Sequence, residues 1–280
     1  MLITEQVSNL KKGEKPMKLR KKPTSVIKSN AIIEGRFNIT LVEMKLFLSV
    51  LTQISPADTD FRVYRVYYRD LFDKMDVSGN MYDYIKASCK SLVDKTLVIE
   101  TGKGHLITSF FSSIETYHNE SYIDFCFDPK LKPYLLQLKS NFTVYDIRNI
   151  LPCKSVYSIR IYQLLKQFEK IGNRTLELDE LKEMLGLSKN AYTQWINFKT
   201  KVISPSEKEL KKYSDIFFTY TKIKRGRKID SIKFTINRKK QQRLFDAKND
   251  SPYLTFEQVE AQQKALDEMG PMPYCEWAKG

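Results

Sequence analysis

The segment Leu178–Ile236 has the most restrictive pattern in the chain. Its apolar residues recur at helical spacing and predict a short helix over Asp179–Leu185, which Gly186 ends. A second helix is predicted to begin near Asn190 or Ala191. Two short helices joined by a tight turn are typical of a helix-turn-helix.

A strand pair follows the two helices, over Ile216–Lys224 and Ile229–Ile236. Its tip reads Lys224-Arg225-Gly226-Arg227-Lys228, so a tight turn brings four positive side chains within a few ångströms of each other. A phosphate backbone would relieve their repulsion, although an exposed basic turn without a partner remains the alternative. The pattern predicts a winged helix-turn-helix, with one helix in a DNA major groove and the hairpin on flanking phosphates.

A fainter copy of the pattern occurs about 110 positions upstream. The shift aligns helix, turn and second helix together, pairing Leu71 with Leu181, Val77 with Leu187, Ser78 with Ser188, Asn80 with Asn190 and Tyr82 with Tyr192. We therefore expect an α+β protein with tandem duplicated winged helix-turn-helix domains.

The positive charge is concentrated in two segments. The chain of 280 residues has a formal net charge of +14. Residues 11–28 hold eight Lys or Arg against one acid, and residues 201–240 hold thirteen against four, which leaves the remainder close to neutral. This uneven distribution favours a polyanionic partner over general solubility.

The predicted domains divide the chain into four parts. Residues 1–29 form a basic mobile arm that contains the run 18–22, and order begins near Asn38. Residues 30–140 form the first winged-helix domain, 141–240 the second, and 241–280 a polar tail with one amphipathic helix at 256–269.

The first domain is expected to open with a helix over 40–54, because Thr40 and Glu43 have capping-box spacing. The other elements predicted for it are a strand at 61–67, helices at 69–75 and 81–95, strands at 97–101, 106–116 and 122–127, and a helix at 129–138. In the second domain a helix from Val156 to Phe168 and a strand at 175–178 precede the helix-turn-helix, and Pro205 should kink or divide its second helix.

One face of that second helix carries the candidate DNA contacts. If Trp195, Phe198 and Val202 face the core, the opposite face is polar and has no acid; an ordinary solvated face is the alternative. The candidates on or near this helix are Lys189, Asn190, Thr193, Asn197, Thr200, Lys201, Ser204 and Lys208. Those on the hairpin are Lys222, Lys224, Arg225, Arg227 and Lys228, and those of the first domain are Lys86 and Lys90, beside a poorer tip at 102–104.

Catalytic and metal-binding signatures are missing from the sequence. Its two histidines, His105 and His118, form no His-x-His site, and Gly102-Lys103-Gly104 lacks the other residues of a phosphate-binding loop. The four cysteines are far apart, which favours reduced packing residues, and no apolar run is long enough to span a bilayer. We expect a soluble cytoplasmic protein that is not an enzyme and uses no cofactor or metal.

Several separate motifs resemble the initiator Rep proteins of theta-replicating iteron plasmids. They are Ser155–Lys166, Leu178–Leu187, Phe198–Pro205 and the wing Lys224–Phe234, and the resemblance covers about residues 27–237, in the family's order. It implies two winged-helix domains that bind tandem origin repeats as a monomer. The second domain would read bases through Asn197, Thr200 and Lys201. The helix that carries these residues has fewer arginines than is usual in the family. The first would contact the DNA backbone and supply a dimer interface.

The resemblance also implies that dimers repress the protein's own promoter, whereas monomers open the origin and recruit host replication proteins such as initiator and helicase. A winged-helix transcription regulator without an origin role is the nearest alternative. A DNA-nicking initiator is an alternative from a different class.

Overall fold

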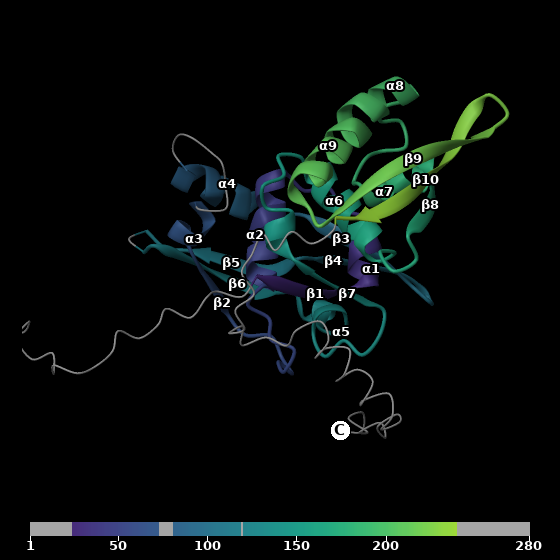
Figure 1. The fold of residues 1–280 in the computed structure, drawn as a ribbon. Helices are drawn as coiled ribbons and strands as arrows, with labels where there is room; N and C mark the ends of the chain where they lie inside the picture. The colour runs from purple at the N-terminus through teal and green to yellow at the C-terminus, as the bar shows by residue number, and fades with distance from the viewer. Residues whose placement is uncertain (1–23, 73–80, 119, 240–280) are drawn as a thin grey trace, which may run out of the picture.

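The computed structural model describes residues 24–72, 81–118 and 120–239 (Figure 1). The predicted basic run 18–22, the predicted helix at 256–269 and Val77, Ser78 and Asn80 of the upstream copy lie outside these residues. No helix within the described ranges has the length and apolarity that crossing a bilayer requires.

The first half follows the predicted order of helix, strand, two helices and strands. Its elements are α1 (Asn30–Glu34), α2 (Leu41–Leu51), β2 (Tyr64–Tyr67), α3 (Tyr68–Phe72), α4 (Met81–Val93), β3 (Thr96–Thr101), β4 (Gly104–Ser109), β5 (Phe111–Thr116), β6 (Tyr122–Phe127) and the short helices η1 (Pro129–Leu131) and α5 (Lys132–Leu135). The capping box is confirmed: the Glu43 carboxylate accepts from the Thr40 N–H at 2.6 Å, and the Thr40 hydroxyl accepts from the Glu43 N–H at 3.3 Å.

The single strand predicted at 106–116 is wrong. The chain divides at Phe110: β4 pairs with β3 in one hairpin, whereas β5 pairs with β6 in a sheet of order β2-β6-β5. Phe110 is fully buried, and its ring centroid lies 5.0 Å from that of Phe37 and 4.8 Å from that of Phe47. Burial of this ring under α2 turns the chain from one sheet into the other.

The predicted arm ends earlier than expected, and order begins well before Asn38. Residues Ser25–Ser29 form β1, which pairs antiparallel with β7 (Phe142–Asp146). Lys28, which the sequence analysis placed in the mobile arm, is fully buried, and its ammonium donates to Gln163 Oε1 at 3.3 Å. Burial and then the charge of Arg160 lower the pKa of Lys28. The strand β1 pairs with a strand more than a hundred residues away, so no local sequence pattern predicted it.

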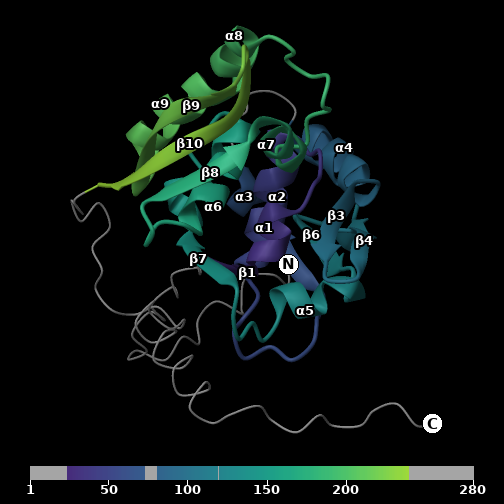
Figure 2. The ribbon, with the colours of Figure 1, turned by 90° about the vertical axis from the view of Figure 1, so that its right-hand side faces the viewer.

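The second half contains the predicted helix-turn-helix and its hairpin. Its elements are η2 (Ile147–Asn149), α6 (Val156–Lys166), β8 (Asn173–Glu177), α7 (Leu178–Met184), α8 (Trp195–Phe198), the π-helical turn η3 (Lys199–Ile203), α9 (Ser204–Tyr213), β9 (Ile216–Arg225) and β10 (Lys228–Arg238). The sheet order is β8-β10-β9, and Phe218 and Phe234 pack edge to face beneath it. In Figures 1 and 2 the β9–β10 hairpin projects from the body beside α8 and α9.

One aligned pair of the two halves, Leu71 and Leu181, has the same burial, whereas Tyr82 is exposed and its equivalent Tyr192 is half-buried. Leu71 in α3 and Leu181 in α7 are both buried, as the upstream copy of the pattern predicts. On α4, Ile85, Cys89 and Leu92 form a buried apolar face, whereas Tyr82 at its start is exposed and its ring packs on that of Tyr68. Burial raises the pKa of the Cys89 and Cys153 thiols to about 12, so both are protonated packing residues.

Arg160 of α6 joins the two halves. Its guanidinium donates to the Met184 carbonyl at 2.7 Å and to the Gly35 carbonyl at 2.8 Å, and it lies 4.0 Å from the Phe37 ring centroid. Burial lowers its pKa to about 9, so the group is still charged at neutral pH. Two salt bridges span the same joint, Arg174–Glu34 at 2.6 Å and Arg36–Glu183 at 3.2 Å.

Gly186 lies directly against the backbone of Phe37 in this joint. Its φ of +73° is left-handed, and a Cβ built on it would lie 2.2 Å from the Phe37 carbonyl oxygen. The residue therefore ends α7 and also lets the turn of the helix-turn-helix lie directly on the first half.

We predict that Gly186→Ala destabilises the protein by about 3 kcal/mol, because backbone strain adds to a clash with the Phe37 backbone. Gly172→Ala is the matched control: its φ of +83° imposes the same strain, but no atom lies within 4 Å of the new Cβ. The control should lose only about 1 kcal/mol. Denaturant unfolding of both variants measures the difference, and equal losses would show that the Phe37 contact does not matter.

Candidate nucleic-acid interface

The elements α8, η3 and α9 follow one another without a break and form what we call the composite helix, Trp195–Tyr213. The turn η3 contains an i→i−5 bond, in which the Ser204 N–H donates to the Lys199 carbonyl. Pro205 comes one residue later and has no N–H to donate. Pro205 does not divide the helix as one form of the prediction expected; a widened turn directly precedes it instead.

The buried face of the composite helix contains Phe198, Val202 and Leu210, each fully buried, whereas Trp195 at its start is half-buried. Among the predicted contact residues, Asn197, Thr200, Lys201 and Lys208 are exposed on the outward side, and Ser204 is half-buried. The outward side therefore offers an amide, a hydroxyl and two ammonium groups, which are donors and acceptors suited to base edges and phosphates.

The predicted start of this helix near Asn190 is wrong. The helix begins at Trp195, because Tyr192 has a left-handed φ of +51° that a helix cannot continue through. Three predicted contact residues, Lys189, Asn190 and Thr193, therefore lie in the exposed link before it. Lys189 is also held back toward α7, 3.2 Å from Glu183.

The basic tip of the hairpin is a tight turn, as the sequence predicts. Arg225 pairs with Lys228, so two residues make the turn, and Gly226 has a left-handed φ of +65°. All side chains from Thr221 to Lys228 are exposed, including the predicted contact residues Lys222, Lys224, Arg225, Arg227 and Lys228. We call the β9–β10 hairpin the wing.

Trp195 connects the composite helix to the wing. Its ring centroid lies 6.1 Å from that of Tyr220 on β9, and the Lys222 ammonium lies 5.9 Å from the Trp195 ring centroid. Burial raises the pKa of Tyr220, which keeps its phenol neutral. The sequence placed Trp195 in the core but did not indicate this contact, since the wing strand lies more than twenty residues away.

The corresponding surface of the first half is poorer in charge. On α4, Lys90 is exposed and Lys86 is half-buried, and the tip of the β3–β4 hairpin carries Lys103 alone. Tyr64 and Tyr68 are buried and Tyr67 is 37% exposed, so these three tyrosines chiefly serve packing. The first half therefore offers fewer cations to a polyanion than the second.

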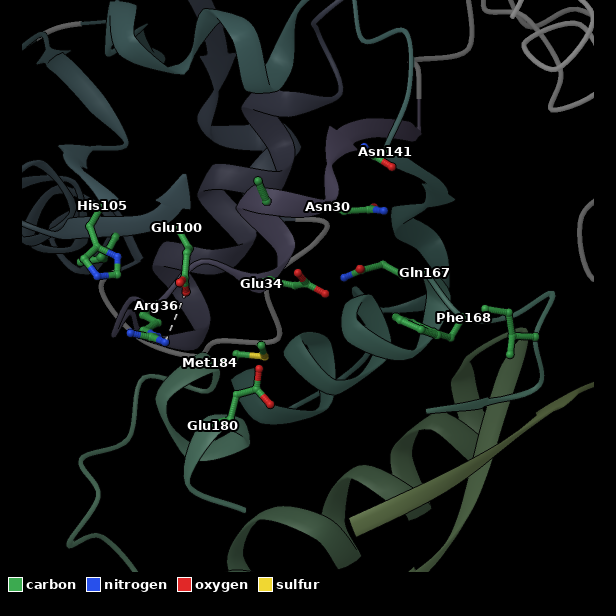
Figure 3. A pocket seen from close by; sticks show the side chains of 13 residues that line it. Asn30, Glu34, Arg36, Glu100, His105, Asn141, Gln167, Phe168, Glu180 and Met184 are labelled. Carbon is green, nitrogen blue, oxygen red and sulfur yellow. Dashed lines mark ion pairs between the residues drawn. The ribbon is translucent and has the colours of Figure 1, made fainter. Parts of the chain in front are cut away.

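A cavity of about 610 Å³ lies between the two halves (Figure 3). Its lining includes three carboxylates, Glu34, Glu100 and Glu180, and two basic side chains, Arg36 and His105. Arg36 is already paired, with Glu100 at 3.7 Å and with Glu183. This balance of charge disfavours phosphate, so the cavity is not an extension of the basic surface. Among the described residues no cluster of His, Cys, Asp and Glu has the arrangement of a metal site.

Comparisons with known proteins agree with this geometry. The sequence model described as "Initiator Replication protein, WH1" matches residues 25–166, and "Initiator Rep protein, WH2" matches residues 177–236. The first match includes α6, whereas the boundary predicted from the sequence lies near residue 140. The expected α+β fold with two winged-helix domains is confirmed.

One solved structure supports the same fold, that of the Pi initiator protein. A crystal structure of the Pi initiator protein in complex with iteron DNA has a TM-score of 0.63 at 22% identity and covers 79% of this chain and 99% of its own. Domains 2 and 3 of RctB reach a TM-score of 0.44 at 16% identity, covering 72% and 85% of the two chains. A WH1 domain of the MSBI1.176 replication protein reaches 0.28 at 20%, covering 34% and 76%.

Asp230 opposes the cations of the wing tip. Its carboxylate lies 3.1 Å from Arg225 Nε, although the Arg225 side chain is 80% exposed. We predict that Asp230→Asn strengthens binding to any DNA duplex severalfold at low salt, because a negative charge beside the phosphates is removed. Titrations at several salt concentrations measure the effect. Glu120→Gln is the control: it removes an exposed acid of the first half and should change the DNA affinity little. If Asp230→Asn instead binds DNA more weakly, the Asp230 carboxylate helps to orient Arg225 toward the DNA.

Proposed function

The chain belongs to the family of initiator replication proteins and contains both of its winged-helix domains, and on this premise we propose that it starts plasmid replication by binding tandem repeats of the origin as a monomer. The observation that carries the proposal is the outward side of the composite helix, held beside a basic wing by Trp195 and Tyr220. The Pi initiator protein, whose fold is similar, was crystallised with iteron DNA.

The two halves would contribute differently to DNA binding. The exposed cations of the wing neutralise phosphates and supply most of the affinity, without regard to sequence. Asn197, Thr200 and Lys201 reach base edges in the major groove, where each bidentate contact adds about 1–3 kcal/mol of discrimination. The first half, through Lys86 and Lys90, adds weaker contacts to the backbone of the same repeat.

The proposal extends to regulation in the bacterial cytoplasm. Monomers would open the origin and recruit host replication proteins such as initiator and helicase. Dimers formed through the first half would bind an inverted repeat at the protein's own promoter and repress it. The protein would act without a catalytic step, cofactor or metal, as a binding protein that reorganises DNA.

Footprinting on the DNA that adjoins the coding gene tests the origin role. We expect protection of several direct repeats by a species with the mass of a monomer, and protection of the promoter by a dimer. Protection of a single operator alone would favour the alternative of a transcription regulator. A nicked product or covalent adduct, after incubation of supercoiled origin plasmid with Mg²⁺, would favour a nicking enzyme instead.

Two substitutions separate affinity from specificity. Arg225→Ala should weaken binding to specific and random duplex alike and lower the salt slope by about 0.9, because it removes one phosphate contact. Lys201→Ala should weaken binding to the repeat more than to random duplex, because it removes a base contact. Affinities for both duplexes at several salt concentrations measure the difference. Equal losses on the two duplexes for Lys201→Ala would show that this helix does not read the bases.

A further inference from the structure

Ile196 is an exposed apolar residue in the first turn of the composite helix. Its side chain is 58% exposed, whereas Phe198, Val202 and Ile203 on the same helix are fully buried. A single exposed apolar residue is common on protein surfaces and by itself indicates nothing. The exposure of Ile196 becomes informative because of where the residue lies on the helix.

Ile196 belongs to the outward side of the helix. At 100° per residue within α8 it lies about 100° from Asn197 and about 160° from Phe198, so it points away from the buried side. Asn197 and Thr200 are both exposed. An isoleucine therefore lies among the polar side chains that the proposed function assigns to base edges.

Ile196 directly follows the residue through which the start of the composite helix contacts the wing. The preceding residue, Trp195, contacts Tyr220 of β9 and lies beneath the Lys222 ammonium. In helix-turn-helix proteins, residues at the N-terminal end of the second helix contact the bases, while flanking cations hold the phosphates. The cations of the wing would thus bring DNA to the side chain of Ile196.

The major groove offers one apolar group to such a side chain. The 5-methyl of thymine is the apolar feature of the four base-pair edges, which otherwise present hydrogen-bond donors and acceptors. A β-branched residue in a helix is nearly restricted to one χ1 rotamer, so Ile196 loses little freedom when it packs against a methyl group. Its side chain has no donor or acceptor, so it cannot hydrogen-bond to the other base edges.

We propose that Ile196 selects thymine at one position of the recognised repeat by packing against its 5-methyl group. The proposal rests on the proposed function and adds a specificity-determining residue to it. The contact is apolar, so its contribution depends little on salt, unlike that of the wing.

Uracil substitution tests this contact, because deoxyuridine differs from thymidine only by the missing 5-methyl. Each thymine of the repeat is replaced in turn, and the affinity of the full chain is measured for wild type and Ile196→Ala. At one position the wild type should lose about threefold to tenfold in affinity, the effect of one buried methyl group. Ile196→Ala should bind the natural repeat more weakly by a similar factor and be insensitive to uracil at that position.

Ile171→Ala is the matched control, since Ile171 is 65% exposed and lies by the cavity between the halves. It should keep wild-type affinity and wild-type sensitivity to uracil. Both isoleucines are exposed, so thermal unfolding of the two variants should match that of the wild type. This comparison separates loss of the contact from a general effect of removing surface isoleucine.

Two results would overturn the proposal while leaving the proposed function intact. In one, the wild type binds the repeat specifically but no uracil substitution changes its affinity. In the other, Ile196→Ala retains the wild-type sensitivity at every thymine. Failure of the wild type to prefer the repeat over random duplex would contradict the proposed function itself and remove the basis of the inference.

Discussion

The buried guanidinium of Arg160 is the interaction on which the arrangement of the two halves depends. The group is shielded from solvent: it donates hydrogen bonds to the carbonyls of Met184 and Gly35, and the Phe37 ring covers it. Hydrogen bonds from a charged group to buried acceptors each contribute about 1.5–3 kcal/mol, and the two carbonyls that accept from Arg160 come from the two sides of the joint. The end of α7 is therefore fixed against the first half. Its position in turn sets where the turn at Gly186 and the composite helix lie.

Charge divides the molecule into a joint and a binding surface. Around the joint, acids and bases neutralise one another, as in the pairs of Arg174 with Glu34 and of Arg36 with Glu183. At the wing the cations from Lys222 to Lys228 are exposed, and Asp230 offsets only part of their charge. The net positive charge at the wing thus attracts a polyanion to one end of the second half. The charges between the halves are already paired and add little to this attraction.

Elements formed by neighbouring residues could be predicted, and elements formed by distant residues could not. The capping box of α2, the end of α7 at Gly186 and the two-residue turn at Gly226 follow from local backbone preferences. The strand β1 was missed because it pairs with β7, and the chain was not divided at Phe110 because only the burial of this ring under α2 requires it. The start of the composite helix was misplaced, since the backbone of Tyr192 is left-handed and the sequence around it contains no glycine to indicate this.

The sequence by itself determined the type and order of most helices and strands, the helix-turn-helix pattern and the concentration of positive charge at one hairpin tip, because periodicity and turn chemistry act over a few residues. The tertiary structure decided which residues share a surface. It separated Lys189, Asn190 and Thr193 from the composite helix, placed Trp195 against the wing, buried Lys28 and left Ile196 exposed. Each of these outcomes depends on contacts between segments far apart in the chain, whose energies no local pattern contains.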